Sequence, residues 1–229
     1  AVAVTQVTPN LFIQYTGFEG SSTTANYNLV APPTGDGVGG TFASGELFTA
    51  GASWVSVSNS SNGVHGDTIG GDQILDFNLY NSNPTGFVGT PTASADAMFM
   101  KFDGIGNNED FIVVLKLFNG TSYTTKSLLV QNADIQKGSG VGPGVYSGIT
   151  LDNNDGLIII EANDYNSGAE TWRIVGAQVI VDPLAITGTA INFNNATGAG
   201  GGSSGTQAFS NDTNNGAPMK ISSIGFVTN

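Results

Sequence analysis

The feature that most limits how this chain can fold is the length of its apolar runs. Almost every run is short, is rich in Val, Ile, Phe and Thr, and ends at Gly, Asn, Asp or Pro. The first group of residues favours β-strands and the second favours turns, whereas an amphipathic helix would repeat its apolar residues every three or four positions. Such a helical repeat is nearly absent, so the sequence predicts an all-β protein.

Segments with the length and composition of strands occur along the whole chain. They span residues 11–18, 41–48, 52–57, 73–80, 97–102, 111–118, 123–130, 145–151, 157–162, 171–181, 185–193 and 220–228. In segment 111–118, apolar residues alternate with Lys116, which predicts one buried face and one face that is at least partly wet. Asn119 and Gly120 form a strong hairpin signal, so segments 111–118 and 123–130 are expected to pair antiparallel. Many short strands joined by such turns predict a β-sandwich of the jelly-roll-like kind with long loops.

The length and composition favour one folded unit. The chain has 229 residues, of which 39% are hydrophobic, and a β-sandwich of this size is often a single domain. We expect residues 1–182 to form the sandwich and residues 183–229 to add C-terminal strands packed on the same domain. Segment 196–215 is dominated by Gly, Ser, Thr and Asn, which predicts a mobile loop because such residues bury little apolar surface.

The charge balance excludes several classes of partner. The net charge is −12, from 18 acidic and 6 basic residues, so no basic run can neutralise a nucleic-acid backbone or an anionic membrane. The acidity fits either a soluble secreted surface or carboxylates that hold divalent cations. Cysteine is absent, which excludes disulfides and thiolate zinc sites. No stretch approaches the roughly 18 apolar residues of a membrane-spanning helix, and the start lacks a signal-peptide pattern, so we interpret the chain as part of a longer extracellular protein.

Three stretches resemble a known family. Residues 220–228 read KISSIGFVT, residues 66–77 read GDTIGGDQILDF, and residues 172–176 read WRIVG. These stretches are similar to the ligand-binding region of the large bacterial surface adhesins of the RTX type. The tandem nonapeptide GGxGxD of the calcium-binding β-roll is not present, so the resemblance does not extend to that part of the family.

The resemblance implies a function in cell adhesion at the bacterial surface. In this family, modules near the tip of a fibril grip target cells and adjoin neighbouring adhesin modules. Some are peptide-binding domains that hold a free C-terminal end with the help of bound calcium, and others are lectins that bind glycans. The peptide-binding type is the closer match, and a monomeric module is expected.

Acidic turns supply candidate calcium ligands. Calcium takes six to eight oxygen ligands at about 2.3–2.6 Å, which loops provide when they crowd Asp, Asn and Glu together. The candidate metal ligands are Asp67, Asp72, Asp103, Asn107, Glu109, Asp110, Asp152, Asn154 and Asp155, and a further cluster spans residues 163–166. None has EF-hand spacing. The alternative is that Asp, Asn and Gly simply satisfy the geometry of tight turns. If strands 73–80, 97–102 and 111–118 run antiparallel in turn, loops 66–72 and 103–110 lie at one end of the sandwich.

Other residues are candidates for direct ligand contact. They are Asn108, Tyr146, Tyr165 and Arg173. The tyrosines could stack on a sugar ring. Arg173 is the only arginine, and its guanidinium suits either a ligand carboxylate or an internal acid such as Glu170 or Asp164, with the internal pair favoured.

The two tryptophans and the single histidine are expected to have structural roles. Trp54 and Trp172 lie in strand-like segments and are expected to pack in the core. His65 is expected to be a surface or turn residue, and with no second His it predicts neither a zinc site nor a catalytic triad.

Four functions remain open at this point. The first is calcium-dependent binding of free peptide ends, and the second is calcium-dependent binding of glycans. The third is a structural spacer within the fibril. The fourth is a glycosidase that uses two carboxylates such as Glu109 and Asp155. The non-enzymatic binding functions are favoured.

Overall fold

The computed structural model describes residues 2–8, 10–19, 50–51, 53–58, 60–70, 73–105, 109–181, 189–193, 206–208 and 218–228. The predicted strand 41–48 lies outside these ranges, as do most of the Gly-rich segment 196–215 and the candidate residues Asp72, Asn107 and Asn108.

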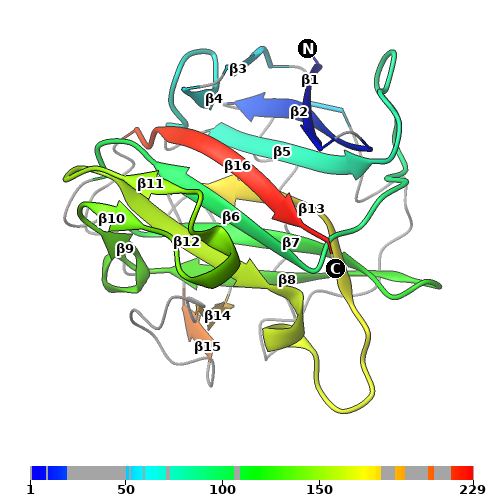
Figure 1. Ribbon diagram of the computed structural model, residues 1–229. Coiled ribbons are helices and arrows are strands. Elements are labelled where there is room, and N and C mark those ends of the chain that lie inside the picture. The colour runs from blue at the N-terminus through cyan, green and yellow to red at the C-terminus, as the bar shows by residue number, and fades with distance from the viewer. Residues whose placement is uncertain are drawn as a thin grey trace.

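Two β-sheets form the fold, as Figure 1 shows, and the prediction of an all-β sandwich is confirmed. The larger sheet has eight strands in the order β1 (Ala3–Thr8), β2 (Leu11–Glu19), β5 (Gln73–Tyr80), β13 (Arg173–Ile180), β7 (Phe111–Phe118), β8 (Tyr123–Val130), β14 (Thr189–Asn192) and β15 (Thr206–Ala208). The smaller sheet has six strands in the order β3 (Val55–Val57), β4 (Asn62–Val64), β16 (Ile221–Val227), β6 (Ala97–Phe102), β12 (Gly156–Glu161) and β9 (Gln136–Lys137). Neighbouring strands pair antiparallel, apart from the parallel pair of β8 and β14.

Short elements complete the described part of the chain. Strands β10 (Gly140–Val141) and β11 (Thr150–Leu151) form a small hairpin, and single 3-10 turns lie at η1 (Asn132–Asp134), η2 (Gly144–Tyr146) and η3 (Ala162–Tyr165). The predicted strand 145–151 is therefore wrong over most of its length, because Gly144 adopts a positive φ of 52° that starts a turn. The Gly-rich segment, predicted as a loop, contains β15.

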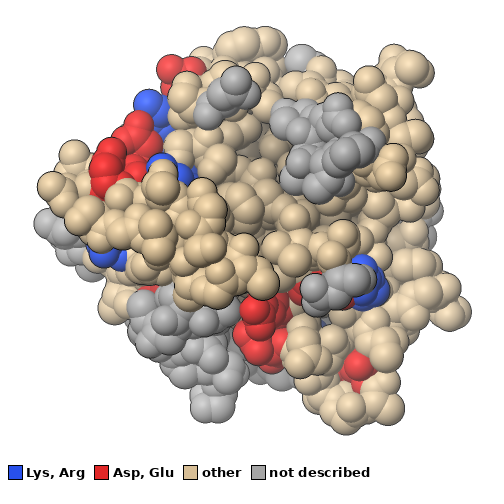
Figure 2. Space-filling view, in the orientation of Figure 1, with Lys and Arg blue, Asp and Glu red and all other residues tan. Residues whose placement is uncertain are grey.

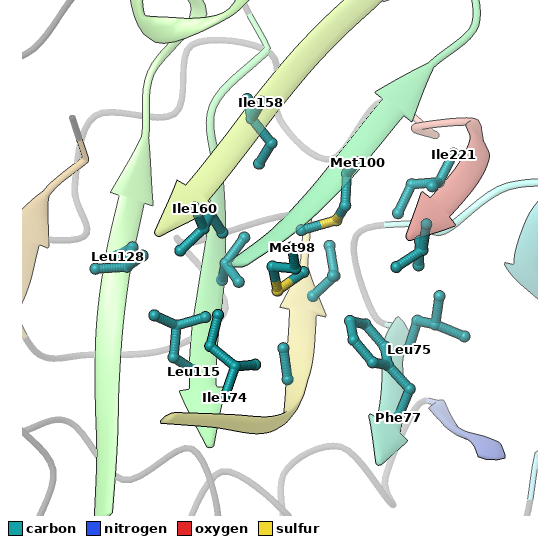
Figure 3. Packing of buried hydrophobic residues seen from close by; sticks show 14 of the residues in the cluster. Leu75, Phe77, Met98, Met100, Leu115, Leu128, Ile158, Ile160, Ile174 and Ile221 are labelled. Atoms are coloured by element: carbon teal, nitrogen blue, oxygen red, sulfur yellow. The ribbon is translucent and has the colours of Figure 1, made fainter. Parts of the chain in front are cut away.

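The core lies between the two sheets and is built by alternation along each strand. In β6, Met98 and Met100 point inward, and in β7 Leu115 does the same (Figure 3). Phe77 of the larger sheet meets Phe226 of the smaller sheet edge to face, with ring centroids 6.1 Å apart. The last strand, β16, pairs with β4 and β6 in the interior of the smaller sheet, so the C-terminal segment completes this same sandwich.

The predicted hairpin is confirmed, but the face that carries Lys116 is buried and does not contact water. Strands β7 and β8 pair antiparallel from Phe111–Val130 to Phe118–Tyr123. Lys116 is fully buried, although its position on the face away from the core predicted contact with water. Its Nζ donates to Oδ1 of Asp76 at 2.5 Å and to Oδ1 of Asn78 at 2.9 Å. The larger sheet is thus buried on both faces at its centre, and an ion pair replaces hydration.

The predicted burial of Trp54 is wrong. Its side chain is 52% exposed, whereas the sequence predicted a core position. The reason is alternation beside an edge strand: Val55, the next residue, points into the core, so Trp54 points outward. Trp172 is half-buried and packs against the core as expected. His65 is an exposed turn residue with a φ of 55°, and its Nε2 lies 2.9 Å from Oε2 of Glu19.

Replacing the buried lysine is expected to destabilise the fold. Lys116→Met leaves the carboxylate of Asp76 buried without its cation, which costs about 3–5 kcal/mol of unfolding free energy. Urea denaturation measures this change. Thr121→Met is the control, because Thr121 is exposed in the turn between residues 118 and 123 and its replacement should cost no more than about 0.5 kcal/mol. Equal stability of the two variants would contradict the role of the buried pair.

Candidate functional site

One polar pocket lies on the outer face of the smaller sheet, where β6 ends and β16 begins. Its volume is about 310 Å³. We call it the β6–β16 pocket, and it is lined by Ser60, Lys101, Asp103, Asp152, Asp155, Ser222 and Ser223. Charged side chains gather near the start of β16 on this face of the molecule (Figure 2). The lining comes from segments that are far apart in the sequence, so the fold itself assembles the pocket.

Strand alternation and a β-bulge aim the side chains into the pocket. Met100 and Phe102 of β6 point into the core, so Lys101 between them points outward. The register of β16 shifts between Ile221, which pairs with Phe102, and Ser223, which pairs with Lys101. Such a bulge places an extra residue in one strand. Here the extra residue is Ser222, and its Oγ donates to the carbonyl oxygen of Lys101 at 3.1 Å.

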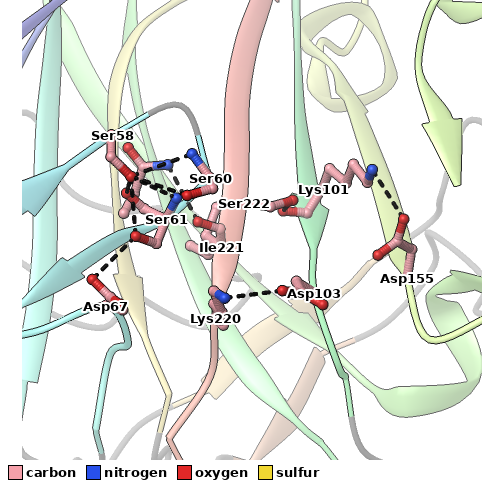
Figure 4. Close-up of polar contacts among 11 residues, drawn as sticks. Ser58, Ser60, Ser61, Asp67, Lys101, Asp103, Asp155, Lys220, Ile221 and Ser222 are labelled. Atoms are coloured by element: carbon pink, nitrogen blue, oxygen red, sulfur yellow. Dashed lines mark hydrogen bonds and ion pairs between the residues drawn. The ribbon is translucent and has the colours of Figure 1, made fainter. Parts of the chain in front are cut away.

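Two lysine–aspartate ion pairs hold residues of the pocket lining, as Figure 4 shows. Nζ of Lys101 lies 2.9 Å from Oδ2 of Asp155, and Nζ of Lys220 lies 3.0 Å from Oδ2 of Asp103. The hydrogen bond and the charge of Asp103 raise the pKa of Lys220 above its ordinary value. This lysine therefore stays charged at neutral pH.

The two acidic loops at the pocket are joined by hydrogen bonds. The backbone N–H of Asp152 donates to Oδ2 of Asp155 at 2.8 Å, and the N–H of Asn154 donates to Oδ1 of Asp152 at 2.9 Å. The carbonyl oxygen of Asn154 then accepts from the N–H groups of Gly104, at 3.1 Å, and Ile105, at 3.2 Å. Gly104 has a φ of 70°, a conformation that favours glycine. Turn chemistry thus accounts for several polar groups that the sequence offered as metal ligands.

The loop that contains Asp67 lies at the same end of the sandwich. Oγ of Ser61 donates to Oδ1 of Asp67 at 3.2 Å. The backbones of Ile69 and Met219 pair, which brings this loop beside Lys220. The loops around residues 67 and 103 therefore share one end, as predicted. The reason differs from the prediction, because β6 belongs to the smaller sheet while β5 and β7 belong to the larger one.

Glu109 and Asp110 lie apart from the pocket lining. Both side chains are buried, just before β7 begins. Oδ1 of Asp110 accepts the backbone N–H of Asn132 at 3.0 Å. The charge of Glu109 acts on Lys137, where it partly offsets the lowering of the lysine pKa by desolvation.

The predicted contact residues Tyr146, Tyr165 and Arg173 do not line the pocket. The ring of Tyr146 is buried and meets Phe99 edge to face at 6.4 Å between centroids. Tyr165 is buried in η3 and packs in the main core.

Arg173 forms an internal ion pair, as favoured from the sequence. Its partner is Asp96, and its Nε also donates to Oγ of Ser94 at 2.9 Å. Neither Glu170 nor Asp164, the acids suggested by proximity in sequence, makes this contact. Glu170 instead accepts the N–H of Ser167 at 2.8 Å.

Sequence reasoning missed the basic and hydroxyl groups of the pocket. Lys101 could have been found, since it is the one charged residue in an otherwise apolar strand and alternation places it outward. Lys220 and Ser222 carry no such signal, because their position depends on how β16 docks beside β6 and on the bulge.

Comparison with known proteins identifies no family: neither a protein-family model, nor a curated protein, nor a solved structure matches the chain. In the part of the chain that the structure describes, no helix is long and apolar enough to span a membrane. Within the same residues, no three Asp, Glu, His or Cys side chains gather closely enough to hold a metal ion.

Removing Asp155 is expected to loosen the pocket. Asp155→Ala takes away the acceptor for both the Lys101 ammonium and the backbone N–H of Asp152, and the loss of hydrogen bonds to a charged group costs about 1.5–3 kcal/mol. Urea denaturation should show this loss, and hydrogen exchange should accelerate at residues 152–155. Asn153→Ala is the matched control in the same turn, because Asn153 is exposed. Similar exchange rates in both variants would show that Asp155 does not hold the loop.

Proposed function

We propose that this protein is a non-enzymatic ligand-binding module of a bacterial surface adhesin of the RTX type and that its ligand binds in the β6–β16 pocket. The observation that carries the proposal is the assembly of that pocket: charged and hydroxyl side chains from separate segments converge at one end of a rigid sheet. Loops held by a rigid scaffold are the usual place for binding residues. The extracellular location and the adhesive role come from the sequence resemblance.

The donors and acceptors of the pocket support a glycan as the ligand. Lys101 has three N–H groups, and its pair with Asp155 uses one of them. Asp152 is exposed and offers carboxylate oxygens, while the serines offer hydroxyls that both donate and accept. Sugar hydroxyls likewise donate and accept, so they match a lining in which the two kinds of group alternate. Three aspartates against one lysine in the lining also disfavour an anionic ligand.

A free peptide C-terminus is the second candidate ligand. The observation in its favour is that Lys101 lines the pocket and that Lys220, another of the 6 basic residues, pairs with the lining residue Asp103. Ammonium groups bind carboxylates through charge-assisted hydrogen bonds. The acidic surroundings work against this ligand, which makes it the weaker of the two.

The chemistry of the pocket supports binding without catalysis. Ser222 Oγ donates to a backbone carbonyl instead of to a base. His65 does not line the pocket and pairs with Glu19. Of the two carboxylates considered for a glycosidase, Asp155 is engaged by Lys101 and Glu109 does not line the pocket.

Ligand screens test the proposed function. We expect a glycan array to show binding, and peptides with free C-terminal carboxylates to bind no better than the same peptides with amidated ends. Lys101→Gln should weaken glycan binding about tenfold, the effect of about 1.4 kcal/mol. Lys137→Gln, a change at an exposed lysine outside the pocket, should leave it unchanged.

Each alternative predicts a different result in these screens. Preference for free over amidated peptides would favour the peptide-terminus function. Absence of binding on both screens would favour a spacer within the fibril and would overturn the proposed function. Release of reducing ends from a sugar panel would show an enzyme.

Calcium is part of the proposal through Glu109 and Asp110. They are consecutive in the sequence and both buried, and buried carboxylates fit an oxygen-liganded cation in chemistry. Bound calcium would supply positive charge there, and because it would bind the folded state and not the unfolded chain, it would stabilise the fold. The carboxylates at the β6–β16 pocket fit less well, because lysines already neutralise Asp103 and Asp155.

Calcium is therefore expected to raise the melting temperature. A ligand at 100 times its Kd stabilises by about 2.7 kcal/mol, which corresponds to roughly 5–10 °C for a domain of this size. Scanning calorimetry with calcium or with a chelator measures the shift. The double variant Glu109→Gln and Asp110→Asn should lose it, whereas Asp164→Asn, at an exposed acid in η3, should keep it. No shift in the wild-type protein would exclude calcium as a stabilising ligand.

A further inference from the structure

The acidic groups at the β6–β16 pocket already have partners. Asp155 is paired with Lys101 and Asp103 with Lys220, at 2.9 and 3.0 Å. Oδ1 of Asp152 accepts a backbone N–H of its own turn. Two of the three carboxylates that line the pocket thus have a neutralising cation from the chain itself, and the third accepts a backbone hydrogen bond.

Each lysine joins two segments that are distant in the sequence. Lys101, on β6, reaches the turn before β12, and Lys220, just before β16, reaches the loop after β6. These contacts connect the loops around the pocket. A calcium ion in a loop site does the same by collecting oxygen ligands from several residues. In this protein, two tethered ammonium groups make those connections.

The ion pairs also oppose calcium at this place. Calcium requires six to eight oxygen ligands within about 2.6 Å, and at Asp103 and Asp155 it would have to share each carboxylate with a lysine ammonium. Those ammonium groups would lie close to the ion and repel it. Asp155 is also fixed by the N–H of Asp152 and is only 4% exposed, so it has little freedom to turn toward an added ion.

We propose that the β6–β16 pocket works without a metal ion, with Lys101 and Lys220 as built-in cations that hold its loops and with Lys101 presenting N–H donors to the ligand. This inference rests on the proposed function of the pocket and concerns how that site is organised. It departs from the calcium-dependent binding that the sequence predicted. This inference does not concern the calcium proposed at Glu109 and Asp110, because those residues do not line the pocket.

Calcium titration followed by NMR tests the inference without any organic ligand. In the wild-type protein, the backbone amide signals of Asp103, Gly104, Asp152 and Asp155 should not shift in a saturable way as calcium is added. In the double variant Lys101→Gln and Lys220→Gln, which frees the carboxylates, the same signals should shift with an apparent affinity at least tenfold higher than in the wild type. The control variant Lys101→Arg and Lys220→Arg keeps both charges and should behave as the wild type.

Two results of the titration would overturn the inference. Saturable calcium shifts of these amides in the wild-type protein would show that the lysines do not exclude the ion. No gain of calcium binding in the glutamine variant would show that the lysines do not occupy the place of a cation. If the double variant does not fold, Lys220→Gln alone serves, because this lysine is largely at the surface and its loss uncovers Asp103.

A glycan-binding measurement with and without calcium separates the failure of this inference from the failure of the proposed function. Binding of an array-positive glycan should be the same in calcium and in chelator. Binding that disappears in chelator would overturn the metal-free site while leaving the adhesive function intact. Failure of every glycan and peptide to bind would remove the proposed function, and the calcium titration would still decide the role of the lysines.

Discussion

The alternation of side chains along β6 is the constraint on which both the core and the pocket depend. This strand lies between β16 and β12 in the smaller sheet, and its inward residues Met98, Met100 and Phe102 fill the space between the sheets. Because the period is two, burying those residues forces Lys101 to the outer face. A slip of one residue would bury the lysine and expose the methionines. Core packing therefore fixes the position of the charge that organises the pocket.

Strand alternation also fixes the polar residues of the larger sheet, but there it buries them. Its central strands are buried on both faces, so the polar residues that alternate with the core residues are removed from water. Register places Asp76 beside Gln178, and Nε2 of Gln178 donates to Asp76 at 2.8 Å. Lys116 supplies the balancing charge. Removing one partner of a buried pair leaves an uncompensated charge, so any register that separates Lys116 from Asp76 is disfavoured.

Strand periodicity explains which parts of the fold could be predicted. Segments 73–80, 97–102, 111–118 and 123–130 were predicted with the bounds that the structure has, since each is a long run of β-formers. Strands β1, β4, β9, β10 and β15 were missed. Apart from the six-residue β1, these are two- or three-residue pairings in which Gly, Asn and Gln give no signal of their own. The burial of Lys116 and the exposure of Trp54 depend on which strands lie at the centre or the edge of a sheet. That order is set by tertiary packing and is invisible to local patterns.

The acids of the candidate site could be predicted from the local sequence, whereas the lysines that neutralise them could not. Asp103, Asp152 and Asp155 were identified as functional candidates because acids crowd into turns there, and the structure brings all three to one pocket. A cluster of acids in a sequence does not reveal what neutralises it. Here the neutralising groups come from the outer face of β6 and from the residue before β16, and only the docking of β16 beside β6 brings Lys220 to Asp103. In a chain with 6 basic residues, the placement of each one has a large effect on the local field. Two lysines at one end of the sandwich make that end chemically different from the rest of an acidic surface, which is why we propose that the ligand binds there.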